Sequence, residues 1–525
     1  MGAMKTPGVY IDEKSAFPNS VVEVETAVPA FIGYTGKADN KGKTLLNKPF
    51  RITSMAEFHD YFGFGPNPVF TIEENSDENV ESDFNQAGKA YVIKQSRGKY
   101  LLYYSMKLFY QNGGGPCYIV SIGTYEERKG EQTIDPGLLK AGIKLLIEEK
   151  EPTIMVIPET TLLSLDDSIN VQQASLSHSG GEMKNRVSIL DIHDGHKKRQ
   201  DPDGDPVAAF RNLIGINYLD FATVYYPWIN TTIVQDDEIS YENFDETSLT
   251  LLKRLIATDM RLYSADQEDA RVKESLKQIE SLSNKDEDWL KTEEGEAEVT
   301  KDDISLMKRS LHASLVSNSA LFKTIMKESK NKLNLLPPAA AIAGIYTMVD
   351  NTKGVWKAPA NVGLNAVVSP VVDISHDDQE DLNVTPQGKS INAIRAFIGE
   401  GTKVWGSRTL DGNSLDWRYI NVRRTMIMLE ESIKLAVKGY EFENNDANTW
   451  VTIKSMIQKF LTDIWKRGGL AGTNPDHAFS VYVGLGETMT PEDILESILI
   501  VTVLVALVRP AEFVEISFQQ QMQKS

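Results

Sequence analysis

The tetrapeptide His193-Asp194-Gly195-His196 holds residue types that readily bind a metal ion or transfer a proton. It follows an apolar run, 186–192, that predicts a buried strand, so these side chains would lie at a strand end. The spacing offers no third ligand on a helix, and the chain has only seven histidines. We therefore interpret the tetrapeptide as a polar loop after a strand.

Two other stretches resemble ligand-binding loops but have the wrong spacing. Residues 36–44 resemble a phosphate loop, yet position 37 is Lys and the Gly is at 36. Residues 201–205 resemble a calcium loop, yet they lack the twelfth-position Glu and contain Pro202, so Asp205 is better used as a helix cap. The chain has no G-x-S-x-G, H-E-x-x-H or paired CxxC motif. The sequence thus predicts no catalytic residue, no cofactor and no metal site.

Cys117 is the one cysteine, so no intramolecular disulfide can form and a reducing cytosol is the expected place of synthesis. A thiol could act as a nucleophile, but Cys117 lies in the apolar run 116–120. We interpret it as part of a buried strand.

Composition excludes several classes of protein. The length of 525 residues predicts two to four domains, and the hydrophobic content of 41% is that of a globular protein. The net charge of −19 argues against nucleic-acid binding, which needs a basic surface. Residues 498–508 are the most apolar segment but are too short to span a bilayer, so we expect no membrane insertion. Residues 1–6 contain no apolar stretch of signal-peptide type.

Strand and helix patterns alternate from about 100 to 230, which predicts an α/β sheet. Asp135 and Asp205 each precede a proline and a spaced apolar face, the pattern of a capped helix start. The predicted strands are 22–34, 117–122, 153–157, 186–192 and 221–229, and the predicted helices are 101–111 and those that begin after Asp135 and Asp205.

Apolar residues also recur at helical spacing near the C-terminus. One helix is predicted through Val422, Leu429 and Val437 and a second through Ile453, Phe460 and Ile464. The β-branched run 498–508 predicts a central strand. Two polar segments interrupt this pattern, and we interpret 66–98 as a surface insertion and 232–334 as an acidic, helical insertion.

Both ends of the chain are predicted to be extended segments without a local strand partner. Pro7 and Pro510 lack an N–H and bias the preceding residue toward extended geometry. An unpaired strand satisfies its backbone by adding to the edge of another sheet. A chain with such a strand at each end can link two neighbours, which favours a polymer.

The same residues carry a family resemblance. The stretches T-P-G-V-Y-I at 6–11 and R-P-A-E-F-V at 509–514 are similar to those of contractile tail sheath proteins of phages, tailocins and extracellular injection particles. Internal matches lie at 224–229, 354–361, 404–410 and 417–424. The resemblance covers about 1–40, 100–230 and 335–525.

The resemblance implies a multidomain α/β and α+β fold, in which the N- and C-terminal parts build one domain and the middle is inserted. The expected parts are a linking arm (1–20), a core sheath domain (21–99 and 335–508), an inserted α/β domain (100–231), an acidic helical outer insertion (232–334) and a linking strand (509–525).

The implied function is that of a structural sheath subunit, not an enzyme, which polymerises helically around an inner tube and contracts from a metastable extended state. The implied partners are further copies of the chain in stacked hexameric rings, an inner tube protein, and baseplate and terminal cap proteins. The resemblance also implies synthesis in a bacterial cytoplasm and function in an assembled particle. The alternatives are a non-contractile filament or surface-layer protein and an α/β enzyme.

Three sets of residues follow as candidates for contacts between chains. The linking segments would use Pro7, Gly8, Val9, Tyr10 and Ile11 at the N-terminus and Phe513, Val514, Ile516 and Phe518 at the C-terminus. The helix 446–467 carries four basic against two acidic residues in an acidic chain, and it would contact the tube through Lys454, Lys459 and Lys466. Arg408, Arg418, Arg423 and Arg424 would either pair within a domain or hold subunit contacts.

Overall fold

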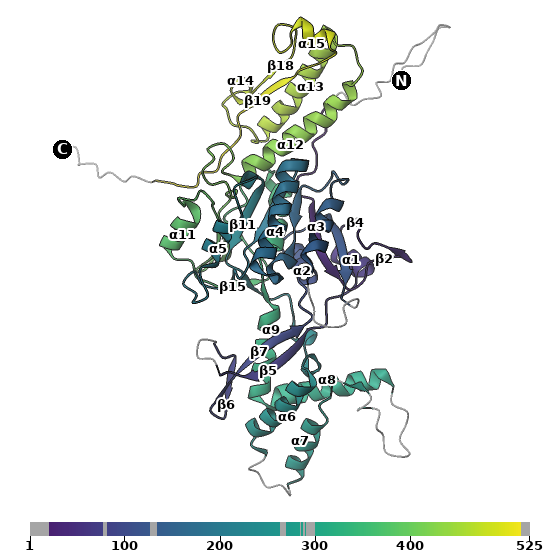
Figure 1. Cartoon of the computed structure of the whole chain (residues 1–525), viewed down its shortest axis with the longest axis vertical. Coiled ribbons are helices and arrows are strands. Elements are labelled where there is room, and N and C mark those ends of the chain that lie inside the picture. The colour runs from purple at the N-terminus through teal and green to yellow at the C-terminus, as the bar shows by residue number, and fades with distance from the viewer. Residues whose placement is uncertain are drawn as a thin grey trace, which may run out of the picture. The chain divides into compact units, whose positions relative to one another are not determined.

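The chain folds into two compact units, shown in Figure 1 as a computed structural model. The structure describes residues 20–76, 81–125, 134–262, 269–283, 285–286, 289 and 300–515. The sheet unit comprises Ala27–Met348 and Pro359–Arg418. The terminal unit comprises the residues up to Thr26, Val349–Ala358 and the residues from Tyr419 onward.

The sheet unit is built on a nine-stranded sheet, counted over the described residues, in the order β14-β17-β16-β11-β10-β9-β1-β8-β4. The strands β8, β1, β9, β10, β11 and β16 pair in parallel, whereas β4, β17 and β14 add antiparallel edges. The strand bounds are β1 (Pro29–Thr35), β4 (Pro49–Ile52), β8 (Cys117–Thr124), β9 (Ile154–Val156), β10 (Val187–Asp191), β11 (Ala222–Tyr226), β14 (Val362–Gly363), β16 (Asn392–Phe397) and β17 (Gly401–Trp405).

Helices cover both faces of this sheet because side chains alternate along each strand. Ala30 and Ile32 of β1 pack with Leu139 and Ile143 of α3. Phe31, between them in sequence, faces the other way and contacts Phe109 of α2, with ring centroids 5.1 Å apart. Outside the two insertions, the helices of the sheet unit are α1 (Met55–Phe62), α2 (Leu102–Gln111), α3 (Pro136–Leu145), α4 (Leu165–Leu176), α5 (Pro206–Leu213), α10 (Ala339–Lys353, which continues into the terminal unit) and α11 (His376–Asn383).

The local helix signals are confirmed. Asp135 accepts from the N–H groups of Gly137 and Leu138, and Asp205 caps α5 in the same way. The small residues of α10 allow close packing on α2, because a Cβ at Gly344 would lie 2.6 Å from the carbonyl oxygen of Phe109. The predicted strand over 22–28 is wrong, since β1 begins at Pro29. Side chains take its N–H groups instead: the Val24 N–H donates to Ser432 Oγ and the Val28 N–H to Thr153 Oγ1.

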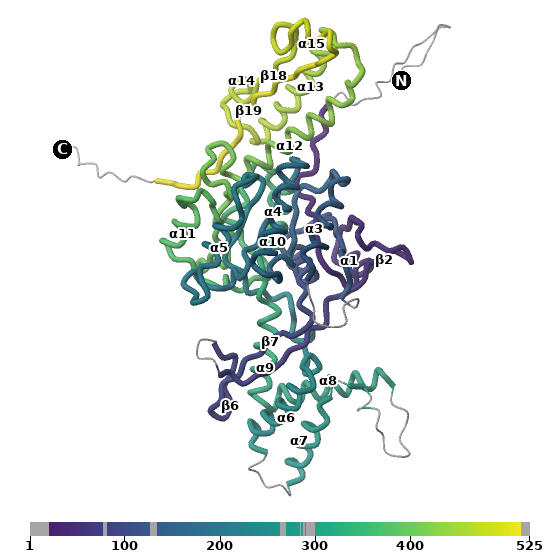
Figure 2. The backbone as a smooth tube through the Cα atoms, viewed as in Figure 1, coloured from purple at the N-terminus to yellow at the C-terminus, as the bar shows by residue number. Residues whose placement is uncertain are grey.

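The sheet crosses the predicted domain boundaries. β1 precedes residue 100 but lies in the centre of the sheet, between β8 and β9, and β14, β16 and β17 follow residue 335. Figure 2 shows purple, teal and green backbone, from early, middle and late parts of the chain, together in this unit. The division observed in the structure therefore falls after Thr26, Met348, Ala358 and Arg418.

The two predicted insertions meet each other (Figure 1). Residues 66–98 form a three-stranded sheet of β5 (Val69–Glu74), β7 (Lys89–Arg97) and β6 (Phe84–Gln86). Its first strand contacts α6, where the Ile72 N–H donates to Ser248 Oγ (2.9 Å). The other helices of the second insertion are α7, α8 and α9, so its predicted helical character is confirmed. The bounds are α6 (Glu246–Asp259), α7 (Ala270–Glu280), α8 (Lys301–Asn318) and α9 (Ala320–Leu333).

Five short strands complete the described part of the sheet unit. A separate sheet has the order β13-β12-β15, with β12 (Ile229–Thr231), β13 (Leu335–Leu336) and β15 (Val367–Pro370). β2 (Asp39–Asn40) and β3 (Lys43–Thr44) form a hairpin. Within the part of the chain that the structure describes, no helix has the length and apolar character needed to cross a membrane.

The terminal unit contains two long helices and a two-stranded sheet. Its elements are α12 (Ile420–Val437), α13 (Ala447–Lys466), α14 (Pro475–Ala478), β18 (Phe479–Tyr482), α15 (Pro491–Leu495) and β19 (Thr502–Val505). Leu429 of α12 packs with Ile453, Phe460 and Ile464 of α13, which confirms both predicted helices. The central strand predicted over 498–508 is wrong: β19 pairs only with β18 among the described strands, and Leu504 is 56% exposed.

Candidate functional site

The crevice where this sheet type usually binds a ligand is filled by a side chain. Chain order reverses at β1, so β1 and β9 form the topological switch point, and open α/β sheets bind ligands outside the carboxyl ends of their strands there. Glu159 follows β9 and is fully buried. Its Oε1 accepts from the Leu102 N–H at the start of α2 (3.0 Å), and a Cβ at Gly33 of β1 would lie 2.4 Å from its Oε2. Burial raises the pKa of Glu159 to about 7.

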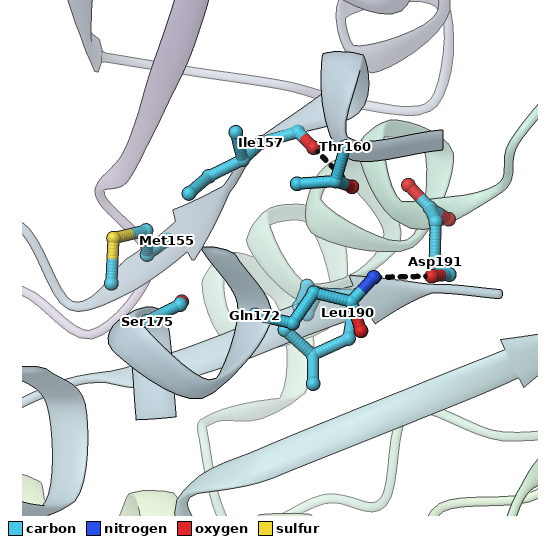
Figure 3. A pocket seen from close by; sticks show the side chains of 8 residues that line it. Met155, Ile157, Thr160, Gln172, Ser175, Leu190 and Asp191 are labelled. Carbon is cyan, nitrogen blue, oxygen red and sulfur yellow. Dashed lines mark hydrogen bonds between the residues drawn. The ribbon is translucent and has the colours of Figure 1, made fainter. Parts of the chain in front are cut away.

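A second buried carboxyl group lies at the end of β10. Asp191 Oδ1 accepts from the Ala339 N–H at the start of α10 (3.0 Å), and burial raises its pKa to about 7. Beside it lies a cavity of about 10 Å³, where Gln172 Nε2 donates to the Asp191 carbonyl oxygen (2.7 Å, Figure 3). This volume has room for a single water molecule at most and is too small for an organic substrate. Both carboxyl groups therefore serve to hold helix starts.

A larger pocket of about 380 Å³ lies between the 198–200 loop and residues 371–374. Arg199, which lines this pocket, is already paired, because it donates to Asp205 (2.8 Å) and Asp381 (2.7 Å). The hydroxyl of Tyr226 donates to the Lys197 carbonyl oxygen (2.8 Å). The side chains that line this pocket therefore do not place a nucleophile next to a general base.

The remaining chemical candidates have structural roles. His193 Nε2 lies 2.9 Å from the Leu163 carbonyl oxygen, and the His196 ring lies 5.1 Å from that of Trp228. No group of three potential metal ligands occurs among the residues described here. The loop that resembles a phosphate site forms the exposed β2–β3 hairpin. Cys117 is buried in β8, as predicted, and burial raises the pKa of its thiol to about 12.

Three of the four arginines named as candidates either for pairing within a domain or for subunit contacts are buried in their own chain, which favours the first alternative. Arg408, Arg423 and Arg424 are 3%, 8% and 4% exposed. Arg408 Nη1 donates to the Asn383 carbonyl oxygen (2.8 Å), and Arg424 forms a two-point ion pair with Asp350. Arg418 is half-buried and donates to the Gly412 carbonyl oxygen (3.1 Å). The exposure of these arginines depends on residues far away in the sequence, so sequence spacing alone does not predict it.

The three lysines of α13 have different surroundings. Lys459 and Lys466 are exposed and seven residues apart, so they lie on one face of the helix. Lys454 is half-buried and lies 3.7 Å from Glu487. Asp463 lies between the two exposed lysines in sequence and is itself exposed, so the face keeps a small positive excess.

The C-terminal linking residues are described in part. Phe513 and Val514 are 74% and 75% exposed and belong to no strand, whereas Ile516 and Phe518 lie outside the described residues. The N-terminal candidates Pro7, Gly8, Val9, Tyr10 and Ile11 also lie outside them. The β18–β19 pair has no further ladder partner among the described strands, and Tyr482 and Leu504 are 38% and 56% exposed on it.

Comparisons with known proteins find relatives among phage tail sheath proteins. Residues 413–521 match the phage tail sheath C-terminal domain. The tail sheath protein of Vibrio phage KVP40 is 30% identical over 138 residues, and that of Enterobacteria phage T4 is 26% identical over 135 residues. Each match covers 26% of this chain and 20% of the phage protein, so the chain spans about a fifth of the length of these curated relatives.

Solved structures match over nearly the whole chain. The helical sheath of the anti-feeding prophage in the contracted state matches with a TM-score of 0.57 and 25% identity. A chain of the anti-feeding prophage baseplate matches with a TM-score of 0.56 and 26% identity. Each match covers 99% of this chain and 100% of the other. The contracted sheath complex of the extracellular contractile injection system PVC, at 24% identity and a TM-score of 0.57, shares the fold.

Proposed function

We propose that this chain, a relative of the contractile tail sheath proteins in sequence and in fold, is the sheath subunit of a phage-tail-like injection machine. The observation that carries the proposal is the match, over 99% of the chain, to a contracted helical sheath. The filled switch point fits a structural role.

Copies of the chain would associate head to tail, a contact that generates a helix when it does not close into a ring. The N-terminal arm, through Pro7–Ile11, and the C-terminal segment, through Phe513, Val514, Ile516 and Phe518, would add to the sheets of neighbouring copies. The β18–β19 pair is the acceptor that we favour, because no further described strand joins it and it has exposed apolar side chains. Main-chain ladders of this kind let rigid bodies rotate without separating.

The inner tube would contact α13. Lys459 and Lys466 are its exposed cations, and they would face acidic groups of the tube. Lys454 would support this face indirectly, because it already lies near Glu487.

Contraction would draw on two packings of the same rigid units, a switch that needs no nucleotide. The sheath would be assembled in an extended, metastable state, and a baseplate would trigger its relaxation to a shorter and wider state. The chain would be made in a bacterial cytoplasm. A terminal cap protein would bind one end of the assembled sheath.

Negative-stain microscopy of the protein, expressed alone and together with its neighbouring genes, tests the proposal. We expect hollow striated cylinders that are short and wide when empty and longer and narrower around a tube. Filaments that never enclose a tube would favour a non-contractile filament or surface-layer protein. Monomers or small closed oligomers in both samples would overturn the polymer and return attention to the pocket at Arg199.

A further inference from the structure

The chain just before the sheet unit is held against the terminal unit by side chains, not by a strand ladder. Val21 and Val24 pack against the apolar cluster of α12 and α13. The Val24 N–H donates to Ser432 Oγ on α12 (3.1 Å), and Ser432 is fully buried. This segment connects to the predicted linking arm, so its fixation determines where that arm begins.

Thr26 is held at two of its atoms by a buried ion pair. Arg424 of α12 donates from Nη1 to Asp350 Oδ1 (3.1 Å) and from Nη2 to Asp350 Oδ2 (2.5 Å). Arg424 Nη2 also donates to the Thr26 carbonyl oxygen (2.9 Å), and the Thr26 hydroxyl donates to Asp350 Oδ2 (2.6 Å). The side chains of Arg424 and Asp350 are only 4% and 3% exposed, so water does not compete for these bonds.

A second, outer contact lies closer to the arm. Arg467, after the end of α13, pairs with Glu23 and lies over the Trp356 ring, 5.0 Å from its centroid. The Arg467 side chain is 50% exposed, so salt weakens this pair, whereas the buried pair is screened much less. Residues 23–26 are therefore held by two contacts, an outer ion pair at Glu23 that salt weakens and a buried ion pair at Thr26 that salt affects much less.

We propose that the Arg424–Asp350 pair is a clamp that fixes the root of the N-terminal arm on the subunit through Thr26. The proposal rests on the linking function proposed above, and it assigns Arg424 and Asp350 as positioning residues for that function. A fixed root restricts the directions in which the arm leaves the subunit. It thereby raises the effective concentration of the arm at a neighbour's sheet edge.

Hydrogen–deuterium exchange of the full chain tests the clamp in the free subunit. The informative variants are Asp350→Asn, which leaves Arg424 without its charged partner, and Thr26→Val, which removes one donor and keeps the carbonyl oxygen. We expect peptides within 20–26 to exchange roughly tenfold faster or more in both variants, while peptides of α13 keep the wild-type rate. The matched control is Lys434→Ala, which removes an exposed ion pair of α12 (Lys434–Glu431, 3.0 Å) and should change neither.

A folded Thr26→Val protein whose peptides within 20–26 exchange at the wild-type rate would overturn the clamp. If Asp350→Asn does not fold, the result for Thr26→Val decides the question by itself. A lower yield of ordered polymers from Thr26→Val than from Lys434→Ala would support its role in linking. Removal of Met1–Ser20 tests the linking arm independently of the clamp. Normal polymers from that deletion would refute the linking arm, and the exchange data would still test whether Thr26 is held by the Arg424–Asp350 pair.

Discussion

Two buried carboxyl groups show how single residues serve the sheet unit. Glu159 and Asp191 each accept a hydrogen bond from the first N–H of a helix, α2 and α10 respectively. Each lies near the carboxyl end of a strand, where an enzyme of this sheet type would hold its substrate. Burial raises the pKa of both to about 7, well above that of a carboxyl group in water.

These raised pKa values predict a pH-dependent stability. Between about pH 4 and 7 the folded chain holds protons at Glu159 and Asp191 that the unfolded chain has released. Their contribution to the free energy of unfolding is therefore complete below pH 4, decreases as the pH rises and is lost above about 7. Asp191→Asn keeps an acceptor for the Ala339 N–H but cannot ionise. As the pH rises through this window, the free energy of unfolding of the variant should therefore fall less steeply than that of the wild type. The difference in slope should be at most about 1.4 kcal/mol per pH unit.

Urea unfolding at pH 5, 6 and 7 measures this difference, with the exposed Asp302→Asn as the matched control. A wild-type pH profile for Asp191→Asn would contradict the assigned protonation of this carboxyl group.

At the scale of elements, α13 presents one packed and one charged face. The double substitution Lys459→Glu and Lys466→Glu reverses the charge of the exposed face without touching the core side of the helix. We expect co-assembly with the tube to be lost, while the free energy of unfolding changes by no more than about 0.5 kcal/mol. Co-sedimentation with purified tube measures the first effect and urea unfolding the second. Lys434→Glu on α12 is the control, and unchanged co-sedimentation of the double variant would exclude α13 as the tube contact.

The β18–β19 pair predicts a second effect at this scale. Lysine on an exposed edge strand discourages further strand pairing, so Leu504→Lys should block polymer formation and leave the monomer folded. Ile398→Lys makes the same change at the fully exposed β16–β17 turn and should leave polymers intact. Electron microscopy and circular dichroism of the two variants provide the comparison. Equal polymer yields would show that strand addition does not use this edge of the sheet.

At the scale of the whole molecule, we expect the predicted linking arm to be needed for polymer formation and not for folding. The contacts of the described N-terminal segment begin at Val21, so deletion of Met1–Ser20 should leave a folded monomer that forms no ordered polymers. Size-exclusion chromatography and microscopy of the deletion variant measure both properties. Long, regular sheaths from this variant would remove the argument for linkage through the arm.

The extent of prediction from sequence also depends on scale. Asp135, Asp205 and the apolar face of α13 were predictable because a helix cap or face is formed by residues a few positions apart. The burial of Arg424 was not predictable, because its partner Asp350 lies 74 residues away. The same reason applies to Glu159, whose helix start is 57 residues away, and to the contact between Ile72 and Ser248 across 176 residues.

The sequence by itself determined the helices with clear caps or apolar faces (α2, α3, α5, α12 and α13), the five strands β1, β8, β9, β10 and β11 and, through its terminal and internal motifs, the resemblance to contractile sheath proteins. Only the tertiary structure decided that β1 lies at the centre of the sheet, that the two insertions pack together and that 498–508 contributes an exposed edge strand. Periodicity records how one segment alternates between apolar and polar surroundings. Strand order and ion pairing depend on which distant segments meet, and no local pattern encodes that choice.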